Sequence, residues 1–287
     1  MQLKIELLGF IARRAVSTLL VLGLVMTSPL VLAVQQFTSG ERQVVLLELF
    51  TSEGCSSCPP ADKWISTLKT TPGLWEDFVP VAFHVDYWDW IGWKDRYAEP
   101  EFSARQRRYK DLGFARSVYT PGFFLGGEEW KGWFKGTPPN WHSLKKVGPL
   151  ALSIEDKGVI DVVFSPRFDA LNIRQVSDTG KAPETLQLHI ALLGFDEQSP
   201  IRDGENTGKN LVHDFVVMDY RVVRSDTFTP ASGPHTTAQP QTRAPYEGGE
   251  YQWNTKYLQS TLAKGIVAWV TTENSPEPLQ ATGGYLR

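Results

Sequence analysis

The spacing of apolar residues predicts a strand followed by a helix near residue 50. Residues 44–50 form a short apolar run rich in Val, Leu and Phe, which is typical of a buried strand. Downstream, apolar positions recur at i, i+3, i+4 and i+7, which is one face of a helix. These positions are Ala61, Trp64, Ile65 and Leu68. The Thr-Pro-Gly sequence at residues 71–73 ends this helix.

The same kind of alternation between strands and helices continues as far as residue 147. Residues 79–85 predict a second buried strand, and a helix begins at Pro100, because proline suits the first turn of a helix. Residues 122–127 predict a strand that ends in a Gly-Gly turn, with residues 131–134 as its hairpin partner. A short helix at residues 140–146 completes the order β-α-β-α-β-β-α.

From about residue 148 the pattern changes to short stretches of alternating apolar and polar residues. These stretches are residues 150–154, 158–164, 186–193, 214–223 and 265–272. Residues 229–249, rich in Pro, Ser, Thr and Gly, predict a long flexible loop. We therefore expect an α/β domain at residues 42–147, followed by a β-rich, antiparallel sandwich-like domain at residues 148–287.

The N-terminus has the pattern of an export signal. Lys4, Arg13 and Arg14 precede an apolar run, and Val31 and Ala33 fit the small-residue rule for a signal peptidase site. Residues 1–33 are therefore predicted to be a signal peptide, and an uncleaved membrane anchor is the alternative. Both interpretations place the remainder outside the cytoplasm, in the periplasm or the extracellular space, and only the second involves the membrane.

The net charge and the cysteine content limit the kinds of function that the chain can have. The net charge of −3 argues against a nucleic-acid binder, which would carry a basic surplus. Cys55 and Cys58 are the only two cysteines in 287 residues, in the sequence EGCSSCPP. A bridge that closes so short a loop stabilises a fold little, which favours chemistry over a structural role. An inert local disulfide and half of a metal site remain as alternatives.

The position of the pair between a strand and a helix suggests a role for each thiol. Cys55 would lie at the helix N-terminus, where free N–H groups and the helix dipole stabilise a thiolate. Cys58, one turn further along, would be shielded and would resolve a mixed disulfide formed at Cys55. No metal and no cofactor other than this redox-active disulfide is expected.

An aromatic and acidic segment follows the second predicted strand. His84, Asp86 and Asp89 have a spacing that could hold a metal, or supply a proton acceptor for Cys58. Turn capping and core hydrogen bonding are the simpler account. Nearby aromatic residues could form a wall that grips a peptide, or could be buried between the domains. They are Tyr87, Trp88, Trp90 and Trp93.

Three other features are given mainly structural interpretations. The run Arg105-Gln-Arg-Arg108 is typical of a solvated helix face and not of an anion site. Residues 204–210 contain glycines and a lysine but lack the spacing of a phosphate-binding loop. His213 is interpreted as structural, with a position facing the cysteines as the alternative.

A further motif makes the cysteine pair resemble a known superfamily. Thr120 and Pro121 directly precede a predicted strand, and a cis proline there would leave the backbone of the preceding residue free for a substrate. With the strand, the Cys-x-x-Cys pair and its helix, this arrangement resembles the thioredoxin-like superfamily. The resemblance implies that the Thr120–Pro121 bond is cis, faces the cysteines and shapes a groove for an extended substrate.

Longer motifs resemble a narrower family. The segments LELFTSEGCSSCPPAD, AFHVDYWDWIGWKD, ARQRRYKDLG with SVYTPGFFLGG, and GENTGKNLVHDFVV are similar to those of the DUF1223 family. These are exported thioredoxin-like proteins whose physiological function is unassigned. The resemblance therefore implies a fold and a layout, and it implies no substrate.

These observations predict an exported thiol–disulfide oxidoreductase that acts on protein or small-molecule disulfides through an unknown thiol partner. The alternative is a non-catalytic binding module for a peptide or for a metal such as copper. Thioredoxins carry Trp before the first cysteine and Gly-Pro between the two, whereas this chain has Gly54 and Ser56-Ser57. The direction of electron flow is therefore open, because the intervening residues influence the redox poise.

Overall fold

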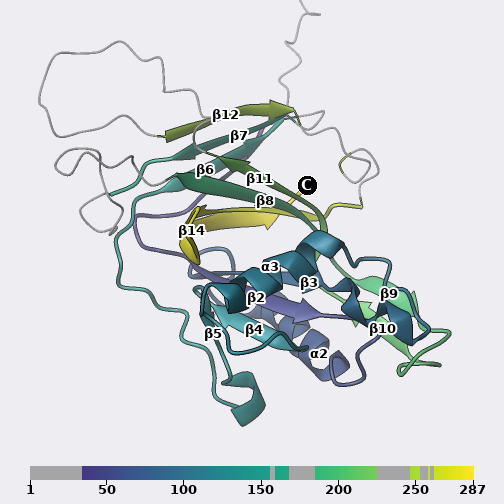
Figure 1. The fold of residues 1–287 in the computed structure, drawn as a ribbon. Coiled ribbons are helices and arrows are strands. Elements are labelled where there is room, and N and C mark those ends of the chain that lie inside the picture. The colour runs from purple at the N-terminus through teal and green to yellow at the C-terminus, as the bar shows by residue number, and fades with distance from the viewer. Residues whose placement is uncertain (1–33, 156–158, 168–184, 225–245, 253–257, 259–261) are drawn as a thin grey trace, which may run out of the picture. The chain divides into compact units, whose positions relative to one another are not determined.

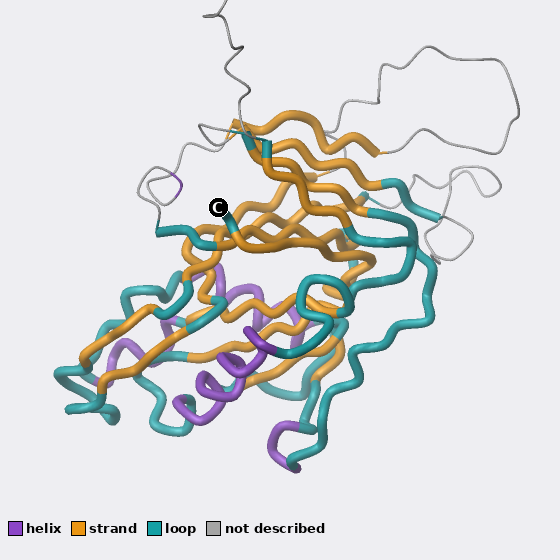
Figure 2. The backbone as a smooth tube through the Cα atoms, turned by 180° about the vertical axis from the view of Figure 1, so that it is seen from behind, coloured by secondary structure: helices purple, strands orange, loops and turns teal. Residues whose placement is uncertain are grey.

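The computed structural model describes residues 34–155, 159–167, 185–224, 246–252, 258 and 262–287 (Figure 1). The predicted signal peptide and most of the predicted loop at residues 229–249 lie outside these residues. The fold is mixed α/β and is dominated by strands (Figure 2). None of its helices, within the described part of the chain, is long and apolar enough to cross a membrane.

An eight-stranded sheet forms the largest element of the fold. In order across the sheet its strands are β14 (Ser275–Tyr285), β13 (Gly265–Thr272), β8 (Leu186–Gly194), β11 (Val216–Arg224), β3 (Phe78–His84), β2 (Val45–Thr51), β4 (Gly122–Leu125) and β5 (Glu128–Glu129). Strand β3 pairs in parallel with β2 and β11, and the other pairs are antiparallel. The sheet thus combines strands from both stretches that the hydrophobic pattern distinguishes.

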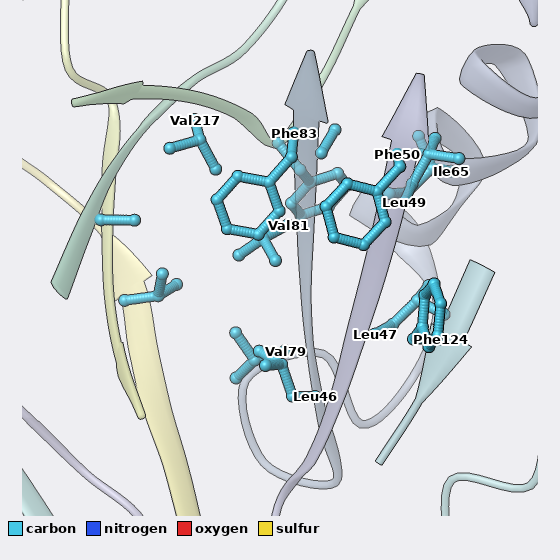
Figure 3. Close-up of a cluster of buried hydrophobic side chains, with 14 of the residues drawn as sticks. Leu46, Leu47, Leu49, Phe50, Ile65, Val79, Val81, Phe83, Phe124 and Val217 are labelled. Atoms are coloured by element: carbon cyan, nitrogen blue, oxygen red, sulfur yellow. The ribbon is translucent and has the colours of Figure 1, made fainter. Parts of the chain in front are cut away.

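The centre of this sheet is covered on both faces. Every residue of β2 and β3 is buried, as expected for apolar runs without alternation. Their side chains pack with residues of α2 and β11, including Ile65 and Val217 (Figure 3). This core holds the ends of β2 and β3 in place. The segment that carries the cysteines follows β2, and His84 is the last residue of β3.

Two α-helices follow β2 and β3 in the chain. Helix α2 (Pro59–Thr67) continues into a 3-10 turn η1 (Leu68–Thr70), and helix α3 (Pro100–Asp111) follows a 3-10 segment η2 (Asp86–Ile91). Ala61 and Ile65 are buried, which confirms the predicted apolar face of α2. Gly113 follows the C-cap of α3 with φ of 84°, a left-handed conformation that glycine adopts without strain.

A four-stranded sheet contains most of the remaining described strands. Its order is β1 (Gln35–Thr38), β6 (Leu150–Ile154), β7 (Val159–Phe164) and β12 (Tyr246–Gln252). Strands β6 and β7 alternate between buried and partly buried residues, as predicted. Their buried side chains share a second core with those of β8 and β13. Strand β12 includes residues 246–249, which were predicted as loop, so that part of the prediction is wrong.

A hairpin formed by β9 (Glu197–Pro200) and β10 (Asn210–His213) makes a separate two-stranded sheet. The hydrophobic pattern did not predict it, because both strands are short and partly exposed. Strand β10 packs against helix α2. Residues 201–209, between the two strands, therefore belong to the neighbourhood of the cysteines.

Two local predictions are wrong. The partner of β4 is β5 at Glu128–Glu129. The two-residue turn at Gly126 and Gly127 reverses the chain direction directly after β4, so the next residues pair with it. Residues 133–135 instead form the 3-10 segment η3 (Trp133–Lys135). Residues 140–146 form no helix, because their backbone pairs with residues 41–43, as in the hydrogen bond from Gln43 N to Lys145 O of 2.9 Å.

Candidate functional site

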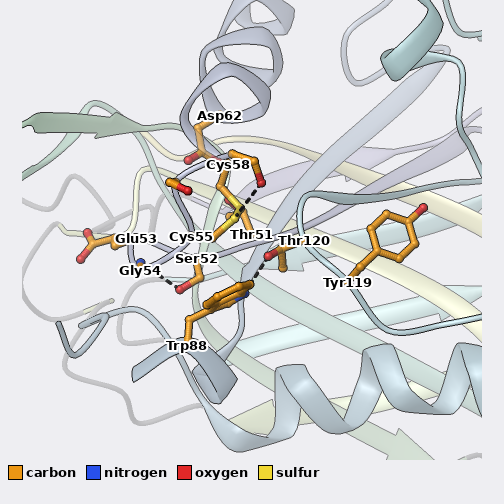
Figure 4. The surroundings of a disulfide bond; sticks show 12 residues. Thr51, Ser52, Glu53, Gly54, Cys55, Cys58, Asp62, Trp88, Tyr119 and Thr120 are labelled. Carbon is orange, nitrogen blue, oxygen red and sulfur yellow. Dashed lines mark hydrogen bonds between the residues drawn. A yellow bond between two sulfur atoms is a disulfide. The ribbon is translucent and has the colours of Figure 1, made fainter. Parts of the chain in front are cut away.

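The two cysteines lie between the end of β2 and the start of α2. They form a disulfide, which Figure 4 shows with its surroundings. Cys55 is 1% exposed and Cys58 is 0% exposed, whereas Ser56 and Ser57 between them are exposed. The bridge is therefore covered by neighbouring residues, and only the serine turn reaches the surface.

Helix α2 begins later than the sequence predicted. Its N-cap is Cys58, whose carbonyl accepts hydrogen bonds from Ala61 N at 2.8 Å and Asp62 N at 3.1 Å. Cys55 lies in the preceding turn, so its predicted place at the helix N-terminus is wrong. The physical reason is the pair Pro59-Pro60, which suits the first turn of a helix but has no N–H groups. Those two positions therefore offer no amide donor to a thiolate.

A buried ion cluster lies beside the disulfide. His213 of β10 places Nε2 3.4 Å from Glu53 Oε1 and Nδ1 3.6 Å from Asp62 Oδ2. All three side chains are buried. Thr51 Oγ1 donates to Asp62 Oδ1 at 2.8 Å, and Trp93 Nε1 donates to Glu53 Oε2 at 2.6 Å. These bonds hold the two carboxylates in fixed orientations on either side of the imidazole.

The charges of this cluster depend on one another. Burial by itself lowers the pKa of His213, but hydrogen bonds and charge attraction from Asp62 and Glu53 outweigh it and raise the pKa to about 10. Burial raises the pKa of Glu53, and the bond to His213 is the main influence that brings that pKa below its usual value. At neutral pH the imidazole is therefore a buried cation held between carboxylates.

A second buried pair continues the cluster. His84 Nδ1 lies 2.7 Å from Asp95 Oδ2, and the same carboxyl oxygen accepts a hydrogen bond from Glu53 N at 2.8 Å. Burial raises the pKa of Asp95, but the charge and hydrogen bond of His84 and the backbone donors lower it overall. The ring centroids of His84 and His213 are 4.9 Å apart. The two pairs thus form one continuous polar region under the turn that carries Cys55.

The loop between β9 and β10 covers the cysteine turn. Asn206 is buried, and its Nδ2 donates to Glu53 O at 2.8 Å and to Cys55 O at 3.0 Å. Lys209 Nζ donates to Asn206 Oδ1 at 2.7 Å, which fixes the amide orientation. Ser56 N donates to Glu205 Oε2 at 3.1 Å. This loop therefore attaches directly to the backbone on both sides of Cys55.

Thr120 lies near the disulfide and is joined to Pro121 by a cis peptide bond. Trp88 Nε1 donates to Thr120 Oγ1 at 2.8 Å (Figure 4). Within the described residues, no backbone hydrogen bond uses the amide or carbonyl of Thr120. A Cβ atom at Gly54 would lie 3.1 Å from Trp88 Cβ, so this close approach explains why a glycine precedes Cys55.

Other predicted site residues lie outside the buried cluster or at its edge. Asp86 accepts a hydrogen bond from Ser103 of α3 and does not join the buried cluster. Asp89 Oδ1 accepts from Asp95 N at 3.1 Å, so it touches the cluster only through Asp95. Trp90 is 80% exposed and is not buried between two parts of the chain. Of the His-x-Asp-x-x-Asp motif, only His84 has its side chain inside the cluster.

Comparison with known proteins places the chain in a family. Residues 46–247 match the family described as "Protein of unknown function (DUF1223)". The chain belongs to the DUF1223 family. No curated protein matches this DUF1223 chain.

Two solved structures resemble the DUF1223 chain. Protein AGR_C_4864 from Agrobacterium tumefaciens is 18% identical with a TM-score of 0.52, and the match covers 85% of this chain and 94% of that one. HBP35 of Porphyromonas gingivalis is 14% identical with a TM-score of 0.42, over 85% and 76% of the two chains. At this identity, the first likeness concerns the fold alone.

Several residues of the DUF1223 site were not recognised from the sequence. They are Glu53, Asp62, Asp95 and Asn206, and His213 was interpreted as structural. The signal available in the sequence was that Glu53 and Asp62 flank the cysteines. In the described part of the chain, no three His, Cys, Asp or Glu side chains are placed to hold a metal ion.

Proposed function

We propose that this DUF1223 protein is an exported thiol–disulfide oxidoreductase that works through Cys55 and Cys58. The observation that carries the proposal is the buried ion cluster packed against the pair. Clusters of ionisable groups with shifted pKa values concentrate at functional sites, where they prepare groups for proton transfer. A disulfide that closes so short a loop has little stabilising effect of its own and does not require such surroundings.

In the proposed reaction the reduced pair transfers two electrons to a substrate disulfide. The Cys55 thiolate attacks one substrate sulfur, a mixed disulfide forms, and the other substrate sulfur leaves as a thiolate. Cys58 then loses its proton and attacks Cys55 Sγ. The Cys55–Cys58 bond forms, and the second substrate sulfur leaves as a thiolate that takes up a proton. The reverse sequence oxidises a substrate dithiol.

Asp62 is the proposed proton acceptor for Cys58. It lies in the first turn of α2, one turn after the N-cap Cys58, and Thr51 donates a hydrogen bond to one of its oxygens. Its second oxygen faces His213, so a proton gained there can be shared within the buried cluster. Glu53 lies beside the His213 cation and Asp95 bonds to His84, so an acidic group stays next to each imidazole while the proton moves.

Thr120 and Pro121 are proposed to shape the substrate groove. The backbone amide and carbonyl of Thr120 have no protein partner in the described residues, so an extended substrate can bond to them. Trp88 holds the Thr120 side chain, and the exposed ring of Trp90 is available to pack against a substrate. These features support the expected thioredoxin-like character of residues 42–147, with the β-rich segment from residue 148 framing the site.

The β9–β10 loop is proposed to limit which substrates reach the sulfur of Cys55. Asn206 bonds to the carbonyls on both sides of Gly54 and contributes to the burial of Cys55. We expect movement of this loop to make the sulfur easier for a substrate disulfide to reach. Large folded partners and small disulfides would therefore react at different rates.

The test is a trapping experiment in the exported compartment. A Cys58→Ser variant of the full chain should accumulate mixed disulfides through Cys55, because the resolving thiol is missing. The matched control is the variant in which both cysteines are serine, which should trap nothing. Absence of any mixed disulfide with Cys58→Ser, from cells in which the variant is folded and exported, would overturn the proposal.

A second candidate function is a non-catalytic peptide-binding module with an inert bridge. The nearly complete burial of Cys55 favours it, because a catalytic thiol must meet its substrate. The two functions differ in how the bridge responds to a dithiol. A redox-active pair is reduced reversibly in a glutathione or dithiothreitol buffer series, whereas an inert bridge is reduced only when the protein unfolds.

A further inference from the structure

The loop between β9 and β10 holds both polar groups of the peptide unit that joins Cys55 to Ser56. Asn206 Nδ2 donates to Cys55 O at 3.0 Å, and Ser56 N donates to Glu205 Oε2 at 3.1 Å. These two consecutive loop residues lie 151 and 149 positions further along the chain than their partners. The contact brings the carboxylate of Glu205 directly onto the turn that carries the cysteines.

Hydrogen bonds within the loop fix the backbone on both sides of Glu205. Gly204 adopts a φ of 75°, and its carbonyl accepts from Thr207 N at 3.2 Å and from Thr207 Oγ1 at 2.6 Å. Lys209 N donates to Asn206 O at 3.1 Å. Glu205 therefore lies in a closed turn whose position is set by the fold.

The carboxylate of Glu205 carries a negative charge at the surface of the cysteine turn. Its residue is exposed. Hydrogen bonds from the Ser56 side chain and from the Ser56 backbone lower the pKa of Glu205, so the group is ionised at neutral pH. A molecule that approaches this turn from solvent therefore meets an anionic group.

The other charged residues of this loop bond within the loop or extend into solvent. Asp203 Oδ1 accepts from the next backbone N–H at 2.7 Å, Lys209 Nζ donates to Asn206 Oδ1 at 2.7 Å, and Arg202 is exposed. In the described part of the chain, Glu205 is the charged loop residue that hydrogen-bonds to the cysteine turn. Salt screens exposed charges over about 10 Å at 0.1 M, so a charge in contact with the turn has the strongest local influence.

A substrate disulfide reaches Cys55 from the side of the two serines. Both cysteines are buried, whereas Ser56 and Ser57 are exposed. Ser57 Oγ lies 3.3 Å from Cys55 Sγ, so the sulfur lies directly under an exposed group. Charged groups on either side of the substrate disulfide must therefore come close to Glu205 during attack.

The interior behind the turn has no surplus of basic groups to cancel this charge. The buried cluster contains three acidic side chains and two imidazoles, which are Glu53, Asp62, Asp95, His84 and His213. The surroundings of Cys55 therefore attract cations and repel anions.

We propose that Glu205 makes the cysteine pair prefer disulfides flanked by cationic groups to disulfides flanked by anionic groups. This inference rests on the proposed thiol–disulfide exchange and names the substrate class for that reaction. The reduced pair gives two electrons and two protons to the substrate, so the Cys55–Cys58 bond forms and the substrate disulfide becomes two thiols. Selection occurs in the attack step, where the carboxylate attracts or repels the charged arms of the substrate.

Oxidation of the purified, reduced chain by small disulfides of different charge tests the proposal. Cystamine carries two ammonium groups, dithiodiglycolate carries two carboxylates, and hydroxyethyl disulfide is uncharged. Acid quenching, alkylation and mass spectrometry measure the rate at which the Cys55–Cys58 bond forms. At low salt, cystamine should react faster than dithiodiglycolate by a larger factor than it does with the uncharged dithiol dithiothreitol.

Glu205→Gln removes the charge and keeps an oxygen that can accept from Ser56 N. It should lower the ratio of the cystamine rate to the dithiodiglycolate rate about fivefold at low salt. The rate with hydroxyethyl disulfide corrects for any change in the reactivity of Cys55 itself. In about 1 M salt the two chains should give the same ratio, because screening then acts over about 3 Å.

Glu128→Gln is the matched control, because Glu128 is exposed on β5 at the edge of the eight-stranded sheet and its loss changes the net charge equally. It should leave the ratio unchanged. Equal ratios for the unmodified chain and folded Glu205→Gln at low salt, or an equal change in Glu128→Gln, would overturn the inference alone. Failure of all three disulfides to oxidise the pair would overturn the oxidoreductase function and the inference with it.

Discussion

Two carboxylates and an imidazole are buried together beside Cys55 and Cys58. Isolated charges of this kind are not tolerated in a protein interior, but His213 lies within ion-pair distance of Glu53 and Asp62. The other oxygen of each carboxylate accepts a hydrogen bond from a fixed donor. Replacing any one of these three residues should therefore lower the stability of the fold. Removing one partner of a buried ion pair typically costs about 3–5 kcal/mol of folding free energy.

The His213 cation makes folding stability depend on pH. Its pKa is about 10 in the folded chain and near 6.5 when unfolded, so the folded state holds a proton that the unfolded state releases between these values. The stabilisation is fully present below the lower value and is lost as pH rises towards the upper one. Across this window the stability should fall by up to about 1.4 kcal/mol per pH unit through His213 alone.

Urea unfolding of the unmodified chain and of His213→Gln, at a series of pH values across this window, measures that contribution. The difference between the two should shrink as pH rises, because only the unmodified chain loses the cation. His142→Gln is the control, since His142 is exposed and its removal should leave the slope unchanged. A constant difference between the unmodified chain and His213→Gln across the window would contradict the prediction.

Among single residues, the sequence singled out the cysteine pair but not the buried groups around it. Cys55 and Cys58 stand out as the only cysteines, and the cis bond at Thr120–Pro121, implied by the resemblance, is confirmed. The carboxylates were missed, because an acidic residue next to an apolar strand looks the same whether it caps a turn or is buried. Only the pairing of Glu53 and Asp62 with His213, far along the chain, shows that these two carboxylates are buried and do not cap a turn.

The β9–β10 hairpin is the element that connects the later half of the chain to the cysteine turn. Its strand β10 carries His213, and its loop carries Asn206. An Asn206→Ala substitution removes the hydrogen bonds to the carbonyls of Glu53 and Cys55. We expect the reduced variant to react with iodoacetamide at Cys55 about tenfold faster than the unmodified chain, because less free energy is needed to move the loop.

Asn210→Ala is the matched control for that measurement. Asn210 lies on the same hairpin and is exposed, and its side chain donates a hydrogen bond to Gln198 at 3.4 Å, away from the cysteine turn. It should leave the alkylation rate unchanged. Equal rates for the unmodified chain and Asn206→Ala would mean that the loop does not limit access to Cys55.

The helices show how much local patterns can predict at the scale of elements. The apolar face of α2 was predicted from the spacing of residues, and the start of α3 was predicted from Pro100. The start of α2 was placed too early, because Pro59 and Pro60 determine where the first turn can begin. The failed helix at residues 140–146 has a different cause, since that backbone is paired with residues 41–43.

In the whole molecule, one sheet contains strands from both predicted domains. Strand β3 lies between β2 and β11, and the core on this sheet includes Phe83, Tyr220 and Trp269. Arg105 of α3 also bonds to Tyr220 of β11. The proposed division at residue 147 therefore does not separate two independent cores.

We expect a fragment of residues 42–147 not to fold alone. Without β11, β3 becomes an unpaired edge strand, and Arg105 loses a partner inside the core. Circular dichroism and NMR amide dispersion of the fragment should indicate an unfolded chain, whereas residues 34–287 should unfold cooperatively. A cooperative unfolding transition of the fragment would contradict this expectation and would support independent domains.

The sequence by itself determined many of the local elements and singled out Cys55 and Cys58 as the only cysteines. Apolar periodicity, proline and glycine positions and the cysteine count act over a few residues, so they can be interpreted without the fold. Only the tertiary structure decided that β10 returns to α2, that Arg105 is buried against Glu48, and that Cys55 is covered by Asn206. These contacts join segments distant in sequence, and burial gives each polar group the partner that determines its charge.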